Sequence, residues 1–116
     1  MASNKEVGQL GENLACEYIE KLGYKILERN KHFSRACELD IIALNKNKTL
    51  VAIEVKTRTS EVCGSGFEAI TPVKYKNIKQ GLFTYLRDNS QYKKFQIDVI
   101  SIILKPEVSI THLKNV

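Results

Sequence analysis

The spacing of apolar side chains along this 116-residue chain changes from a helical to a strand-like period after residue 23. Residues 3–22 predict a helix, because their apolar side chains recur every three or four positions. Ser3 and Glu6 form a Ser-x-x-Glu capping box at its start, and Gly23 is a stop signal at its end. We expect the buried stripe of this helix to consist of Val7, Leu10, Leu14, Tyr18 and Leu22.

Shorter apolar runs, separated by turn residues, predict the first strands. Residues 24–33 predict an edge strand, because charged side chains occupy much of their length. Residues 38–58 predict two strands joined by a polar turn at residues 45–49. If this hairpin is symmetric about Asn47, its facing pairs are Leu44 with Leu50, Ile42 with Ala52, Asp40 with Glu54, and Glu38 with Lys56.

A second helix and a buried strand follow the hairpin. Thr71 as N-cap and Pro72 as the first helical residue open the helix. Its buried face is expected at Tyr75, Ile78, Leu82, Tyr85 and Leu86. Residues 95–104 are almost continuously apolar, which predicts a strand covered on both faces, and residues 108–112 predict a short edge strand. A helix between two strands favours a parallel crossover, so residues 1–116 predict one α/β domain with a mixed sheet flanked by helices.

Three ionisable side chains interrupt the strands of the hairpin. Asp40 lies among leucine and isoleucine, and Glu54 and Lys56 lie two residues apart in the next strand. A buried charge is costly unless it is paired or binds a metal. Two facing carboxylates repel each other unless a cation lies between them or one is protonated. Oxygen ligands of this kind suit Mg²⁺ or Mn²⁺, so Asp40 and Glu54 predict a site for a divalent cation.

The composition restricts the class of protein and of partner. The formal net charge is +5, which favours a polyanionic partner such as nucleic acid. No apolar run approaches the ~18 residues of a membrane span, and the N-terminus lacks the apolar segment of a secretory signal. The three cysteines lie far apart, which is typical of reduced thiols. We therefore expect a cytoplasmic protein without a membrane partner.

The second predicted helix carries an unusual charge pattern. Lys74, Lys76 and Lys79 occupy its first two turns, where cations oppose the helix dipole. A phosphate docked at this helix terminus would explain them, because free backbone N–H groups and ammonium groups would bind it together. A solvated lysine face explains them equally well.

Several of these segments resemble one family. The segments Glu-Leu-Asp-Ile-Ile-Ala and Ile-Glu-Val-Lys-Thr-Arg, with the upstream pair Gly11-Glu12, resemble the YraN family over nearly the whole chain. An Asp followed by Glu-x-Lys on the next strand also resembles the PD-(D/E)xK nucleases, and the YraN pattern is similar to that of archaeal Holliday-junction resolvases. The resemblance implies a restriction-endonuclease-like αβββαβ core, and a metal-dependent nuclease acting on DNA, with branched DNA as one candidate substrate.

The resemblance also implies a role for each candidate site residue. Asp40, Glu54 and the backbone carbonyl of Val55 would hold Mg²⁺ or Mn²⁺, and Glu12 would assist directly or through water. Lys56 would orient or deprotonate the attacking water. The phosphate backbone of DNA would be bound by Arg58, Lys74, Lys76 and Lys79. Nuclease relatives often work as dimers, which makes a homodimer a further expectation.

The residues alone leave other interpretations open. Glu12 lies away from the predicted apolar stripe, and an ordinary surface glutamate would have the same position. The protein could bind nucleic acid without cleaving it. Alternatively, Lys56 could pair with Glu38 or Glu54 while Asp40 accepts backbone hydrogen bonds, without any role in nucleic-acid chemistry. Asp98 is interpreted as a structural hydrogen-bonding residue, and the Gly-Ser-Gly segment at 64–66 as a loop that contacts substrate or only connects elements.

Overall fold

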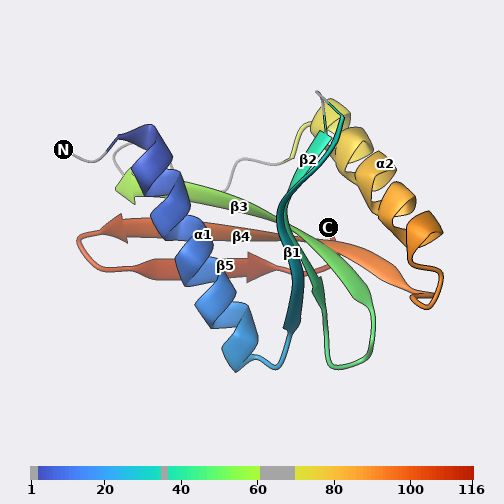
Figure 1. Cartoon of the computed structure of the whole chain (residues 1–116). Coiled ribbons are helices and arrows are strands. Elements are labelled where there is room, and N and C mark those ends of the chain that lie inside the picture. Colours follow the sequence, from blue (N-terminus) through green and yellow to red (C-terminus); the bar gives the residue numbers. More distant parts are fainter. Residues whose placement is uncertain (1–2, 35–36, 61–69) are drawn as a thin grey trace.

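One mixed sheet with a helix on each face makes up the protein, as a computed structural model of residues 3–34, 37–60 and 70–116 shows (Figure 1). The elements, in chain order, are α1 (Asn4–Lys21), β1 (Lys25–Ser34), β2 (Cys37–Leu44), β3 (Leu50–Ser60), α2 (Pro72–Asp88), β4 (Phe95–Lys105) and β5 (Ser109–Leu113). The predicted order of elements is confirmed, including the short last strand. The predicted loop at 64–66 lies outside the described residues.

The strands lie in the order β1-β2-β3-β4-β5, so β1 and β5 are the edges. β3 and β4 pair in parallel through the α2 crossover, and the other neighbours pair antiparallel. This mixed α/β sheet is compatible with the restriction-endonuclease-like core that the sequence predicts. The helices of the described segments include none long and apolar enough to cross a membrane.

Two of the four predicted pairs of the β2–β3 hairpin are confirmed. Leu44 pairs with Leu50 and Ile42 pairs with Ala52. The side-chain oxygen of Asn45 accepts hydrogen bonds from two backbone N–H groups of the turn, which fixes the loop between the strands. The paired region ends at Ile41 and Ile53, so the predicted pairs of Asp40 with Glu54 and of Glu38 with Lys56 lie beyond it.

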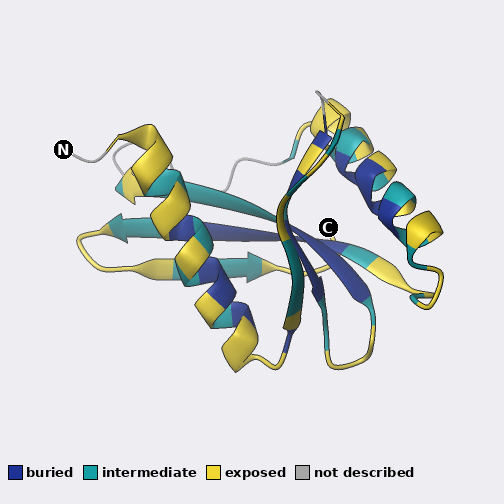
Figure 2. Ribbon diagram, in the orientation of Figure 1, coloured by how far each residue is buried: buried dark blue, intermediate teal, exposed yellow. Residues whose placement is uncertain are grey.

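Each face of the sheet has its own core, and Figure 2 shows both as buried stretches along the strands and the inner sides of the helices. The core under α1 includes Ala15, Cys16, Ile19, Ile41, Val51, Ile53, Ile100 and Ile102. The core under α2 includes Leu39, Ile42, Leu50, Ala52, Ile78, Leu82 and Ile97. Leu39 and Ile42 are three residues apart yet share a face, so the alternation of β2 breaks around Asp40.

The ends of α1 follow the prediction, but its buried face does not. Ser3 Oγ accepts a hydrogen bond from the Glu6 N–H, and Gly23, with φ of 93°, ends the helix in the left-handed conformation. The buried residues are Gly11, Ala15, Cys16 and Ile19, whereas Leu10 is 48% exposed. The predicted stripe is therefore wrong by about one residue of rotation, because the small side chains let α1 lie closer to the sheet than leucine would.

Candidate active site

Asp40 and Glu54 lie together where β2 and β3 separate. Asp40 Oδ2 accepts a hydrogen bond of 2.9 Å from the Val55 N–H, just beyond the last paired residues of the hairpin. The two carboxyl groups are close enough to share a hydrogen bond when one of them is protonated. The structure thus brings together the two carboxylates that the hairpin register placed opposite each other.

The pair is electrostatically strained at neutral pH. Burial and the negative charge of Glu54 raise the pKa of Asp40 from its ordinary 3.8 to about 7, against the opposing effects of the Val55 N–H and the Lys74 ammonium. The site therefore favours the protonated form of Asp40 much more than water does. A bound cation would offset the repulsion between the two carboxylates and so stabilise their ionised forms.

A lysine from α2 partly compensates this charge. Lys74 Nζ lies 3.3 Å from Glu54 Oε1, and the Glu54 side chain is only 11% exposed. Thr71 caps α2 as predicted, by accepting a hydrogen bond from the Lys74 N–H, and so fixes the start of the helix. Lys74, which the sequence placed among the phosphate contacts, is the cation that contacts the carboxylate pair.

Glu12 approaches Asp40 from the opposite face of the sheet. Gly11 contacts the Thr57 side chain so closely that a Cβ atom there would collide with it, and this contact brings α1 against β3. Burial raises the pKa of Glu12, the hydrogen bond from Asn30 opposes the rise, and the charge of Asp40 adds to it. The Glu12 side chain is 16% exposed, so most of it is removed from solvent.

A pocket of about 400 Å³ opens between α1 and β3 beside Asp40. It is lined by Asn4, Val7, Gly8, Glu12, Asp40, Val55, Thr57, Arg58 and Thr59. Gly8 has nothing near its missing side chain, which leaves the mouth of the pocket open. Asp40 therefore belongs both to this pocket and to the carboxylate pair with Glu54, and it links the two sides of the site.

The remaining predicted site residues lie around this centre. Lys56 is partly buried on β3, two residues beyond Glu54, and within the described segments it makes no ion pair with Glu38, Glu54 or another acid. Arg58 lines the pocket. Lys76 is exposed on α2, and Lys79 lies over the rings of Tyr75 and Phe83. The alternative in which Lys56 pairs with either glutamate is thus not observed, although Asp40 does accept a backbone hydrogen bond.

The comparison with known families covers all four predicted catalytic residues. Residues 11–102 match the family model described as "Uncharacterised protein family UPF0102". The chain belongs to the UPF0102 family. The predicted resemblance to the YraN family is thereby confirmed.

Similar proteins from several bacteria match most of the chain. A UPF0102 protein from Syntrophomonas wolfei is 43% identical over 114 residues, which cover 97% of each chain. One from Clostridium botulinum is 45% identical over 103 residues, 87% of this chain and 82% of its own. One from Flavobacterium psychrophilum is 35% identical over 116 residues, 99% of this chain and 96% of its own.

The donor set of this UPF0102 chain fits a hard divalent cation. Among the described residues, no three His, Cys, Asp or Glu side chains are grouped as a ready metal site. Asp40 and Glu54 nevertheless provide two adjacent carboxylates, and burial together with the charge of Glu54 raises the pKa of Asp40. Oxygen donors of this kind suit Mg²⁺ or Mn²⁺, with Val55 and Glu12 as the neighbouring oxygen-bearing residues.

Two residues of the site were missed in the sequence. Asn30 adopts φ of 50° inside β1, and its side-chain amide donates a hydrogen bond of 3.0 Å to Glu12 Oε1. Arg29 Nη2 lies 3.6 Å from the same Glu12 oxygen. Asn adopts the left-handed conformation more readily than most residues, so an Asn within a predicted strand is a signal for it. This conformation lets both Arg29 and Asn30, although consecutive in a strand, reach Glu12. They fix the position of Glu12.

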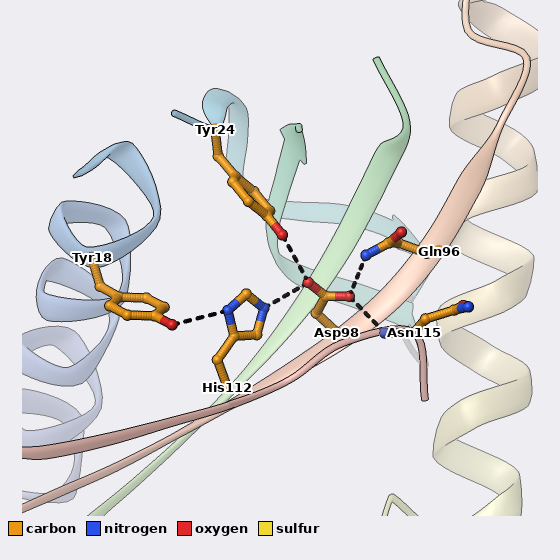
Figure 3. A network of polar contacts seen from close by, with 6 residues as sticks. All are labelled: Tyr18, Tyr24, Gln96, Asp98, His112 and Asn115. Atoms are coloured by element: carbon orange, nitrogen blue, oxygen red, sulfur yellow. Dashed lines mark hydrogen bonds and ion pairs between the residues drawn. The ribbon is translucent and has the colours of Figure 1, made fainter. Parts of the chain in front are cut away.

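A second buried acid, Asp98, lies away from this site in a structural network (Figure 3). His112 Nε2 lies 2.7 Å from Asp98 Oδ2, Gln96 and the Asn115 N–H donate to Oδ1, and the Tyr24 hydroxyl also donates to Oδ2. Burial alone would raise the pKa of Asp98, but these hydrogen bonds hold it below the ordinary value. The structural interpretation of Asp98 is confirmed, since the network joins β4, β5 and the C-terminal residues.

Proposed function

We propose that this protein is a metal-dependent nuclease that hydrolyses phosphodiester bonds of DNA. The observation that supports this most strongly is the pair of partly buried carboxyl groups of Asp40 and Glu54, where burial and the negative charge of Glu54 together raise the pKa of Asp40 to about 7. The Glu-x-Lys spacing, the α/β fold and the net charge of +5 agree with this proposal.

The carboxylates of Asp40 and Glu54 would hold Mg²⁺ or Mn²⁺, assisted by the Val55 carbonyl and, directly or through water, by Glu12. When bound, this ion supplies Lewis-acid activation of the phosphate and stabilises the leaving oxygen. Val55 keeps Asp40 in place through its N–H, and Asn30 and Arg29 keep Glu12 in place. The protein therefore supplies a positioned set of oxygen donors.

Lys56 provides the next requirement, a cation beside the donors, and it makes no ion pair with an acid of residues 3–34, 37–60 or 70–116. It follows Glu54 by two residues, which places both on one side of β3. Its ammonium would orient or deprotonate the attacking water and balance the charge that develops on the phosphate. Arg58 in the pocket, together with Lys74, Lys76 and Lys79 of α2, would bind the DNA backbone.

A nuclease assay on branched, single-stranded and duplex DNA, with Mn²⁺ or with a chelator, tests this proposal. We expect metal-dependent cleavage that Asp40→Asn and Lys56→Ala abolish, while circular dichroism shows both variants folded. Lys21→Ala is the matched control, because Lys21 lies in the last turn of α1. Full activity of either site variant with metal present would remove the catalytic assignment.

The alternative is a protein that binds nucleic acid without cleaving it. The ion pair between Lys74 and Glu54 favours this alternative, because a lysine already supplies part of the positive charge that a metal would supply. It predicts salt-dependent DNA binding and no cleavage of any DNA structure with either ion.

A further inference from the structure

The whole net charge of the chain is concentrated in one segment. Residues 72–96, which comprise α2 and the start of β4, contain six Lys or Arg and one Asp. The rest of the chain contains twelve basic and twelve acidic residues, so the formal charge of +5 belongs to this segment. A polyanion is therefore expected to bind along α2 rather than over the molecule as a whole.

The same surface carries partly exposed aromatic rings. Phe83 and Phe95 are 47% and 42% exposed, and their ring centroids lie 5.1 Å apart with the rings nearly perpendicular. Figure 2 shows exposed residues along the outer side of α2. Large aromatic side chains left half in water, next to lysines, are typical of surfaces that stack unpaired bases.

Aromatic and basic side chains alternate along α2. Tyr75, Lys79 and Phe83 follow one another at intervals of four residues, so they form one row on the helix surface. Lys79 Nζ lies 5.7 Å from the Tyr75 ring centroid and 5.8 Å from that of Phe83. An approaching phosphate would draw the Lys79 ammonium away from the rings, which would uncover Phe83 for a base.

The first turn of the same helix contacts the carboxylate pair. Lys74, one residue before Tyr75, contacts Glu54, and Phe83 lies nine residues further along the helix. At 1.5 Å per residue, Phe83 is about 14 Å from Lys74 along the helix axis. A nucleotide strand of a few residues can span this length, with one end at the proposed catalytic centre.

We propose that the row Tyr75, Lys79 and Phe83, continued by Phe95, binds a single DNA strand whose unpaired bases stack on the exposed rings of Phe83 and Phe95, while half-buried Tyr75 lies beside Lys79. This inference deepens the proposed function and rests on it for the nature of the ligand. It selects unpaired DNA because the bases of a duplex are already stacked on each other and would engage the lysines alone.

Fluorescence anisotropy in a chelating buffer tests the inference without cleavage. The ligands are an oligothymidylate of about 20 nucleotides, the corresponding oligouridylate and a duplex of the same length. We expect Phe83→Leu to weaken binding of the thymidylate by about 5- to 150-fold, the loss expected for one stacked base, and to change duplex binding little. Phe83→Tyr should retain binding, since it keeps the aromatic ring.

Two further variants complete the design. Lys79→Ala should lower the slope of log affinity against log salt by about 0.7, the value of one phosphate contact with a single strand. Lys21→Ala, on the helix that covers the opposite face, should leave affinity and slope unchanged. Unfolding curves of each variant establish that it is folded at the assay temperature.

The outcomes separate this inference from the nuclease proposal. Equal thymidylate binding by Phe83→Leu and the wild type, tighter binding of the duplex than of the single strand, or no binding at all would each overturn the inference, even if the protein cleaves DNA. Tighter binding of uridylate would replace DNA by RNA as the ligand and overturn it as stated. Loss of single-strand binding in Phe83→Leu would support it, even if no DNA is cleaved.

Discussion

Replacing Asp40 by asparagine is expected to stabilise the folded protein at pH 8 while it removes the proposed activity. The amide oxygen can still accept the hydrogen bond from the Val55 N–H, and the amide nitrogen can donate to Glu54. The substitution therefore keeps the local contacts and removes one ionisable carboxyl group from a buried site. Residues that hold charge for function commonly reduce stability in this way.

The magnitude follows from the pKa of Asp40. Because its folded pKa of about 7 lies above the ordinary 3.8, the folded state binds a proton more tightly than the unfolded state. Stability is therefore fully present below about pH 4 and is lost as the pH rises to about 7. At 1.36 kcal/mol per pKa unit, the loss is at most about 4 kcal/mol, and local relaxation makes about 1–4 kcal/mol the expected range.

Urea unfolding at pH 4.5 and pH 8, followed by circular dichroism in a chelating buffer, measures this difference. Asp40→Asn should exceed the wild type by about 1–4 kcal/mol at pH 8 and match it within about 1 kcal/mol at pH 4.5. Asp88→Asn is the matched control, because the Asp88 side chain is 64% exposed and should change stability by less than about 0.5 kcal/mol. A variant that is less stable than the wild type at pH 8, or that differs from it equally at both pH values, would refute this reasoning.

Three further substitutions test other parts of the structure. Gly11→Ala should destabilise the protein by about 1–3 kcal/mol in urea unfolding, because the added Cβ would collide with Thr57. Gly8→Ala is the control, because Gly8 lies in open space, and it should stabilise α1 by up to about 1 kcal/mol. Equal effects of the two substitutions would contradict the close contact at Gly11. Asp98→Asn should lower the free energy of unfolding by about 3–5 kcal/mol at pH 7, because it breaks the buried hydrogen-bond network. The difference should shrink as the pH falls below 3.8, where protonation of Asp98 also destabilises the wild type. An unchanged melting temperature would exclude a stabilising role for this network. Lys74→Gln should raise the midpoint of the Asp40 titration measured by NMR, because the Lys74 ammonium lowers the pKa of Asp40. An unchanged midpoint would show that Lys74 does not affect Asp40.

The elements and the hairpin register could be predicted because they depend on local pattern. The turn at residues 45–49 and the apolar alternation on either side fix which residues of the hairpin pair. Counting outward from the turn was therefore enough to predict that Asp40 and Glu54 lie close together. The capping residues Ser3, Gly23 and Thr71 act within one helical turn of their own position, and all three were recognised. Local signals of this kind need no knowledge of the tertiary structure.

The rotation of α1 and the partner of Glu54 could not be predicted in this way. Apolar periodicity favours the largest side chains, whereas the contact with the sheet is made at Gly11 and Ala15, whose small size permits the closest approach. The ion pair between Lys74 and Glu54 joins residues twenty positions apart, one in the crossover helix α2 and the other in β3. It depends on how α2 lies against β3, which no local pattern specifies.

The most direct test of the proposed metal site is a crystal of the protein grown with Mn²⁺ and measured for anomalous scattering. The account predicts a peak in contact with the carboxylates of both Asp40 and Glu54, absent in crystals of Asp40→Asn. Crystals with no peak between these carboxylates at saturating Mn²⁺, in which Lys74 stays on Glu54, would contradict the account.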